Sequence, residues 1–186
     1  LAGPVAAATR AAKPAAAKAQ PPELPAETLQ AGGTLAGAST ERVYVADIAI
    51  AHIADGRLRV FDARAGKMLG LINTGYAGNF ALSDKRDQLY VATTHLSRSS
   101  RGERTDVLEV HDTSTLAFQY EVVLPPKRAQ ALNYRGLVRP TGNGQFVLVQ
   151  NATPATSITV VDLANRKVAS EVSTPGCWGV MPAATH

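Results

Sequence analysis

The sequence predicts an all-β protein of the β-propeller class, because three similar segments recur along it at a constant interval. Each segment holds short stretches in which apolar and polar residues alternate, such as "RVYVAD" and "GRLRVFD", without the 3.6-residue period of a helix. One stretch in each segment ends in Asp, at Asp62, Asp112 and Asp162, so the repeat measures 50 residues both times (112−62 and 162−112). A period of this size, with several strands per unit, is typical of propeller blades.

Each repeat from Glu41 onward is expected to contribute three strands in the same order. The first strands are the alternating stretches 42–47, 88–94 and 145–151. The second strands are 57–62, 107–112 and 158–162, and each ends in the repeated Asp. The third strands follow a turn and are 67–72, 118–124 and 167–173. Together these units predict about three blades.

The repeated Asp residues have a local structural explanation. A carboxylate at the end of a strand accepts hydrogen bonds from the backbone of the turn that follows, so we interpret all three as turn residues rather than catalytic groups. The residues just before them, Phe61, His111 and Val161, are expected to face a neighbouring blade. His111 is therefore interpreted as a packed or hydrogen-bonded ring rather than a ligand.

Residues 1–40 differ in composition from the rest. They are rich in Ala and Pro, contain no aromatic residue, and carry enough prolines to interrupt every candidate helix. We expect residues 1–40 to be a disordered Ala/Pro-rich N-terminal tail and residues 41–186 to be the N-terminal part of a β-propeller domain. Residues 1–8 fit either the end of a secretory signal or an Ala–Pro linker.

Composition and motifs argue against several function classes. The formal charge of +4 comes from Lys and Arg spread along the chain, and no apolar run approaches the length of a membrane span, so neither nucleic acid nor membrane is an expected partner. The four His and the single Cys lack metal-ligand spacing, so no metal is expected. Phosphate-binding and hydrolase motifs are missing, and Asp106 and Glu109 point to opposite faces of a strand, so they do not form a carboxylate pair.

Two alternatives remain from the residues alone. The propeller could be a non-catalytic scaffold, although the signature of WD-type arrays is missing. It could also be a propeller hydrolase with a central metal, for which Asp47, Asp87 and Asn151 are the candidate ligands.

Four segments carry a resemblance to a known family. They are "SRSSRGERTDVLEVHD" (97–112), "LPPKRAQALNYRGL" (124–137), "QNATPATSITVVDL" (150–163) and "GCW" (176–178). In order and spacing they resemble the heavy chain of the quinoprotein amine dehydrogenases, over residues 43–181. The motifs "LPPKR", "LNY" and "NATPATSI" are more similar to the aromatic amine dehydrogenase branch than to the methylamine branch.

This resemblance implies a periplasmic heterotetramer of two heavy and two light chains. The heavy chain of the family is a seven-bladed propeller, so four further blades are expected beyond His186, and the start at Leu1 also fits a fragment or processed chain. The light chain carries the cofactor tryptophan tryptophylquinone, which is made from two of its own Trp residues. This chain holds Trp178 alone, so we expect it to bind no cofactor and to carry no catalytic residue.

The implied reaction is the oxidation of a small primary amine, here an aromatic one, to an aldehyde and ammonia. Electrons then pass to a blue copper protein of the azurin or amicyanin type. The family's heavy chain lends loop residues to the mouth of the substrate channel, and the corresponding positions here are Ile50, Ala51, His52, Ile53 and Tyr76. The methylamine branch has Phe where Ala51 stands. The alternative is that Ile50 and Ile53 are core residues and Tyr76 is a turn aromatic.

Two further expectations concern individual segments. In the family, the Cys at the position of Cys177 pairs with a second Cys further downstream, so the resemblance implies a disulfide whose partner lies beyond this fragment; a buried free thiol is the alternative. Residues 97–106 are expected to form a charged loop held by pairing among Arg101, Glu103, Arg104 and Asp106. The alternative role for this loop is docking of the light chain or the copper protein.

Overall fold

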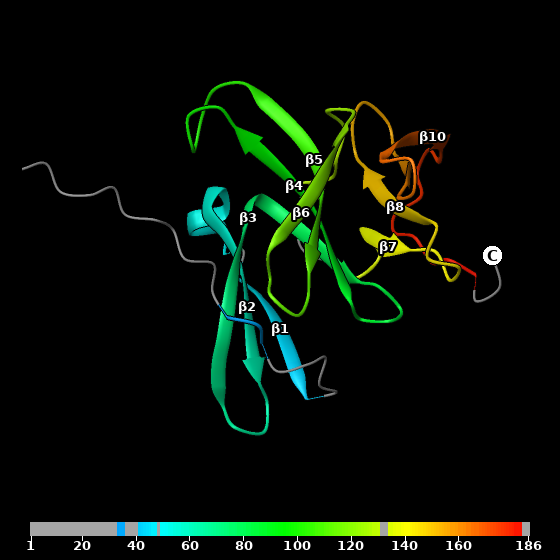
Figure 1. Cartoon of the computed structure of the whole chain (residues 1–186). Coiled ribbons are helices and arrows are strands. Elements are labelled where there is room, and N and C mark those ends of the chain that lie inside the picture. The colour runs from blue at the N-terminus through cyan, green and yellow to red at the C-terminus, as the bar shows by residue number, and fades with distance from the viewer. Residues whose placement is uncertain (1–32, 36–40, 48, 131–133, 184–186) are drawn as a thin grey trace, which may run out of the picture. The chain divides into compact units, whose positions relative to one another are not determined.

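The computed structural model describes residues 33–35, 41–47, 49–130 and 134–183 (Figure 1). The expected tail lies almost wholly outside these residues. Leu35, one of the described residues of the expected tail, donates a backbone hydrogen bond to the carbonyl of Ser114 at 2.6 Å. The described residues form ten strands and one short 3-10 helix, η1.

The elements follow one another with short connections, in this order: β1 (Arg42–Asp47), η1 (Ile50–Asp55), β2 (Gly56–Asp62), β3 (Lys67–Leu82), β4 (Gln88–Leu96), β5 (Arg104–Asp112), β6 (Phe118–Leu124), β7 (Val138–Pro140), β8 (Phe146–Asn151), β9 (Ser157–Asp162) and β10 (Lys167–Ser173). Every pairing between neighbouring strands is antiparallel.

The strands form three blades, and β3 belongs to two of them. Its residues up to Gly75 pair with β2, and its residues from Tyr76 onward pair with β4. Blade 1 is therefore β1, β2 and residues 67–75; blade 2 is residues 76–82, β4, β5 and β6; blade 3 is β7, β8, β9 and β10. Successive antiparallel meanders of this kind confirm the all-β propeller class predicted from the 50-residue repeat.

Blade 2 is covered on both faces, which explains why β4 is buried over most of its length. Leu89 and Val91 pack with Leu58 and Ile72 of blade 1. The residues that alternate with them pack toward blade 3, in a cluster of Tyr90, Ala92, Leu108, Val110, Val122, Leu124, Val138, Val147, Val149 and Val161. Each fully buried Val or Leu stabilises the fold by about 1.5–3 kcal/mol relative to an exposed side chain, so the two clusters hold the blades together.

The three repeated Asp residues close their hairpins as predicted. β2, β5 and β9 end at Asp62, Asp112 and Asp162. A carboxylate oxygen of each accepts hydrogen bonds from backbone N–H groups two or three residues further on, at 2.8–2.9 Å. The Ser114 hydroxyl lowers the pKa of Asp112, and the Asn165 side chain does the same for Asp162.

His111 is a packed and hydrogen-bonded ring, as the sequence predicted. It is 6% exposed, its Nε2 lies 3.0 Å from an oxygen of Glu109, and its ring meets Phe118 edge to face at 5.8 Å between centroids. Glu109 also contacts His95, at 2.7 Å, whereas Asp106 contacts Thr94 instead. The two carboxylates have separate partners, which agrees with their prediction on opposite faces.

The predicted loop 97–106 is too long, and this is a correction. β5 begins at Arg104, so the loop spans residues 97–103, and Asp106 is a buried strand residue. Arg104 and Asp106 do pair, at 2.6 Å. Among the described residues, the side chains of Arg101 and Glu103 form no ion pair. The pair that was expected to hold the loop therefore belongs to the strand.

Candidate functional site

The bend in β3 places Tyr76 at the junction of blades 1 and 2. Gly75 has φ +56° and Ala77 has φ +48°, so the backbone turns on both sides of Tyr76. A Cβ on Gly75 would lie 2.6 Å from the hydroxyl of Thr93, and one on Gly78 would lie 2.3 Å from the carbonyl of Thr74. The glycines of "TGYAG" are thus required for the bend, because a side chain would collide with neighbouring backbone and hydroxyl atoms.

A buried arginine holds this bend from another part of the chain. The guanidinium of Arg128, 3% exposed, donates to the carbonyl of Tyr76 at 2.8 Å and to that of Ala77 at 2.9 Å. It also donates to the hydroxyl of Thr94 at 2.9 Å. Burial lowers the pKa of Arg128 to about 10, so the group is still charged at neutral pH.

Asp106 compensates this buried charge. Its carboxylate is 1% exposed and accepts two hydrogen bonds from Arg104, at 2.6 and 2.8 Å, and one from the backbone N–H of Arg128, at 3.1 Å. The Thr94 hydroxyl donates a fourth, at 2.7 Å. A carboxylate with this many donors is fully satisfied, which makes a charged group tolerable in the interior. The hydrogen bond to Asp106 in turn raises the pKa of Arg104.

A shallow pocket of about 290 Å³ opens beside this network. It is lined by Tyr76, Thr94, Leu96, Ser100, Arg104 and Gln130. Gln130 donates to the Thr94 hydroxyl at 2.8 Å, so the polar side of the pocket is ordered by the same hydrogen-bond network. The half-buried ring of Tyr76 and the side chain of Leu96 supply apolar surface. Such a pocket suits contact with a partner or ligand that has both apolar and hydrogen-bonding groups.

The other four predicted channel residues lie together on η1, which packs against β3. Ile50 is 77% exposed and Ile53 is half-buried, so the alternative that Ile50 is a core residue is wrong. Ala51 and His52 are exposed. The side chains of η1 are therefore mostly exposed, and the helix packs against β3, the strand that also carries Tyr76.

Asp47 anchors the start of this helical turn. Its carboxylate lies 2.9 Å from Arg59 of β2 and 3.5 Å from His52 of η1. A contact of this type between half-exposed groups contributes little stability, but it joins β1, β2 and η1 at one residue. Neither the contacts of Arg128 with the bend nor those of Asp47 with Arg59 and His52 were predicted. The residues in each set are distant in the sequence or belong to unrelated motifs.

The remaining predicted residues have separate positions. Cys177 is an exposed free thiol, so the buried-thiol alternative is wrong, and no disulfide occurs among the described residues. Asp87 accepts a hydrogen bond from Ser83 at 2.7 Å, and Asn151 is buried against Ser157 and Thr159, at 2.9 Å from each. In the described ranges, no group of three or more His, Cys, Asp and Glu is placed to hold a metal. No helix in that part of the chain is long and apolar enough to cross a membrane.

Comparison with known proteins gives one family. A family model described as methylamine dehydrogenase heavy chain (MADH) matches residues 39–186. The heavy chain of methylamine dehydrogenase from Methylophilus methylotrophus is 26% identical over 147 residues, which are 79% of this chain and 36% of that protein. The one from Paracoccus versutus is 28% identical over 144 residues, 76% of this chain and 33% of that protein. The chain thus spans about a third of the length of the curated relatives it matches.

A solved structure agrees at the level of the fold. Acylaminoacyl peptidase in complex with Z-Gly-Gly-Phe-chloromethyl ketone superposes with a TM-score of 0.50 at 11% identity. The match covers 75% of this chain and 25% of that one. At this identity the similarity concerns the arrangement of strands alone.

Proposed function

The chain belongs to the methylamine dehydrogenase heavy-chain family, and from this membership we propose that it is part of the heavy subunit of a periplasmic quinoprotein amine dehydrogenase. The proposed reaction is the oxidative deamination of a primary amine to an aldehyde and ammonia. The proposed partners are a quinone-bearing light chain, in a heterotetramer of two heavy and two light chains, and a blue copper protein that accepts electrons. The observation that carries the proposal is the family match over residues 39–186.

The reacting group is assigned to the light chain. Its tryptophan tryptophylquinone would accept the amine and the electrons, and it requires two Trp residues in one chain. The 186 residues of this chain include one, Trp178, and it is exposed. The residues of this chain therefore do not supply the quinone, and their proposed contribution is to shape and hold the entrance to it.

The entrance is proposed to be the surface of η1 together with Tyr76. Ile50, Ala51 and His52 are exposed on the helix, which packs against β3; Ile53 on the helix and Tyr76 on β3 are half-buried. Arg128 fixes the backbone of Tyr76 by a hydrogen bond of 2.8 Å, and the carboxylate of Asp47 lies 3.5 Å from His52. Residues held in this way keep their positions when a substrate passes, which is what a channel mouth needs.

We further propose that the substrate is an aromatic amine. The small side chain of Ala51 is exposed, so none of the described residues covers it. A Phe at this place would project a ring from the same surface and narrow it. The ring of Tyr76 supplies an apolar edge against which an aromatic substrate can pack.

The proposal is tested by isolating the complete heavy chain from its native source. We expect a small second subunit to co-purify, to show a quinone absorption band, and to lose this band when a primary amine is added under anaerobic conditions. Re-oxidation by a blue copper protein should restore the band. A heavy chain that is isolated alone, without quinone and without amine-dependent reduction of a dye, would instead support a scaffold, and activity that depends on a metal would support a hydrolase.

A further inference from the structure

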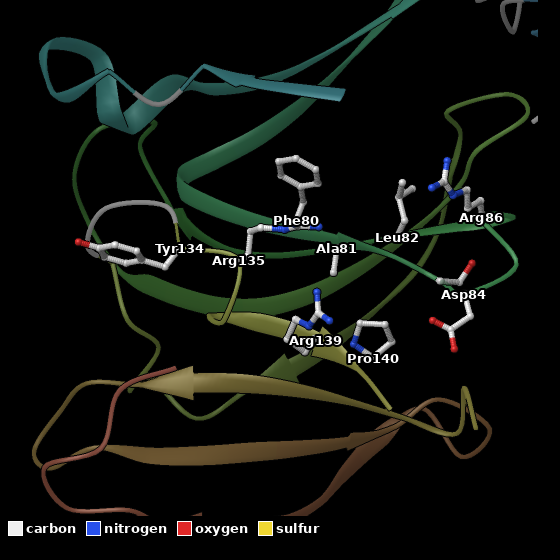
Figure 2. A pocket seen from close by; sticks show the side chains of 10 residues that line it. Phe80, Ala81, Leu82, Asp84, Arg86, Tyr134, Arg135, Arg139 and Pro140 are labelled. Atoms are coloured by element: carbon white, nitrogen blue, oxygen red, sulfur yellow. The ribbon is translucent and has the colours of Figure 1, made fainter. Parts of the chain in front are cut away.

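A second and larger pocket lies between the first strands of blades 2 and 3 (Figure 2). It measures about 480 Å³ and is bounded by the end of β3, the turn to β4, residues 134–135 and the strand β7. Because β3 and β7 contact each other, one wall comes from each blade. A volume of this size is within the range of sites for small organic ligands.

The pocket has an excess of positive charge. Its ionisable lining residues are Arg86, Arg135 and Arg139, with Asp84 as the one carboxylate. Over the described residues, none of the three guanidinium groups donates a hydrogen bond or forms an ion pair. In this they differ from Arg104 and Arg128, whose guanidinium groups donate hydrogen bonds to oxygen atoms of the protein.

Arg139 has a buried hydrogen-bond donor that no acceptor among the described residues satisfies. Its Nε is shielded from solvent and has no hydrogen-bond partner. A buried donor of a charged group without an acceptor is unfavourable by roughly 1–3 kcal/mol, so such a group is normally explained by an acceptor that binds there. In Figure 2 the side chain of Arg139 points toward Ala81, and the side chain of Arg135 is drawn next to Ala81 in this view.

The other walls are apolar. Phe80, Leu82 and Pro140 line the pocket next to the arginines. The arginine fork matches the planar, two-oxygen geometry of a carboxylate or the oxygens of a phosphate. Apolar walls beside such a fork favour a ligand that has an apolar body in addition to its charged group.

We propose that this pocket binds a small organic oxyanion. Its carboxylate or phosphate group is held by Arg135 and Arg139, with Arg86 contributing positive charge, and its apolar body lies against Phe80 and Pro140. The site is separate from the surface of η1 and from the pocket beside Tyr76, with which it shares no lining residue. It does not depend on the proposed amine dehydrogenase function.

The test measures binding to the complete heavy chain by calorimetric titration at constant ionic strength. The probes are benzoate, which has both features, inorganic phosphate, which has charge alone, and benzyl alcohol, which has the ring alone. We expect saturable binding of benzoate, weaker binding of phosphate, and no binding of benzyl alcohol. The absence of benzoate binding would overturn the proposal.

Substitutions of the lining residues test whether benzoate binds in this pocket. Arg139→Met and Arg135→Ala should each weaken benzoate binding at least tenfold, and Phe80→Ala should weaken benzoate but not phosphate. Arg101→Ala, which removes an exposed arginine of the 97–103 loop, is the matched control and should bind as the parent does. Arg135 is exposed, so its variant tests the site even if Arg139→Met fails to fold. Unchanged affinity in Arg135→Ala, or equal affinity for phosphate and benzoate, would contradict the proposal.

Discussion

The guanidinium of Arg128 donates a hydrogen bond of 2.8 Å to the backbone carbonyl of Tyr76, a residue 52 positions earlier in the chain. Arg128 belongs to the segment that leads from blade 2 to blade 3, whereas Tyr76 lies where β3 leaves blade 1. One buried side chain therefore fixes the backbone at the point where consecutive blades meet. The conformation of the proposed channel residue depends on this contact between distant segments.

Replacement of Arg128 by Met is expected to destabilise the protein strongly. It would leave the carbonyls of Tyr76 and Ala77 without the guanidinium donor and remove the buried positive charge near Asp106. Each buried acceptor left without a donor costs about 1–3 kcal/mol, so a loss of several kcal/mol in the free energy of unfolding is expected. Urea unfolding of the complete protein at pH 7 measures it.

Arg104→Met is the matched control for Arg128→Met. Arg104 is the arginine whose side chain pairs with Asp106, but that side chain is 30% exposed, so solvent replaces part of what is lost. The loss in unfolding free energy should therefore be clearly smaller than for Arg128. Equal losses would show that Arg128 has no special role at the bend.

The contact between His95 and Glu109 predicts a pH-dependent contribution to stability. The hydrogen bond to Glu109 raises the pKa of His95. Burial acts to raise the pKa of Glu109, but the hydrogen bonds from His111 and His95 outweigh it and lower that pKa. Across the strand pair, Glu121 adds to the rise at His95, and Arg128 opposes it.

These directions define the pH window. The contribution of His95 is complete below its unfolded pKa of about 6.5 and is lost as the pH rises through its folded pKa. The contribution of Glu109 is complete above its unfolded pKa of about 4.3 and is lost as the pH falls through its folded pKa. Both are therefore present between about pH 4.3 and pH 6.5.

His95→Gln should consequently lower the unfolding free energy more at pH 5.5 than at pH 8.5. The measurement is urea unfolding of the parent and the variant in both buffers. In a Glu109→Gln background the effect of the same substitution should change much less between the two pH values, since only Glu121 still raises the pKa of His95. An undiminished pH dependence in that background would assign it to another group.

The three strands expected in each repeat were predicted well, whereas the strands that begin blades 2 and 3, residues 76–82 and β7, were missed. The 50-residue spacing of Asp62, Asp112 and Asp162 located the ends of β2, β5 and β9 because a local turn requires a carboxylate there. The first strand of blade 2, residues 76–82, was missed because its apolar and polar residues do not alternate regularly. β7 was missed because three residues are too few for an alternating pattern.

The network around the candidate site was not predictable from local sequence. Arg104 and Asp106 are both charged, so the sequence assigned them to a loop, whereas both lie on β5. Asp106 is buried there and accepts hydrogen bonds from Arg104, from Thr94 and from the backbone N–H of Arg128, 22 positions away. The arginines of the larger pocket extend over residues 86–139 and form no motif. Such groups are brought together by blade packing, which depends on contacts between strands rather than on neighbouring residues.

Cys177 is expected to form a disulfide in the complete heavy chain. Its thiol is exposed on the segment after β10, where a second cysteine can reach it. Titration of the denatured, unreduced complete chain with a thiol reagent should find Cys177 unmodified, and prior reduction should make it reactive. The isolated 186-residue chain, which contains no second Cys, is the control and should react without reduction. A reactive Cys177 in the unreduced complete chain would contradict the pairing.

Ala51→Phe should narrow the proposed substrate entrance without changing the chemistry at the quinone. Ala51 is exposed on η1, so the added ring projects from the surface and does not disturb the core. In the assembled enzyme, kcat/KM for phenylethylamine should fall at least tenfold, whereas kcat/KM for methylamine should stay within twofold of the parent, because a small amine still passes. Val172→Phe adds the same ring at an exposed position of β10 and should change neither value. If Ala51→Phe lowers both values equally, or lowers neither, Ala51 does not line the entrance, since a steric block must discriminate between the two amines by size.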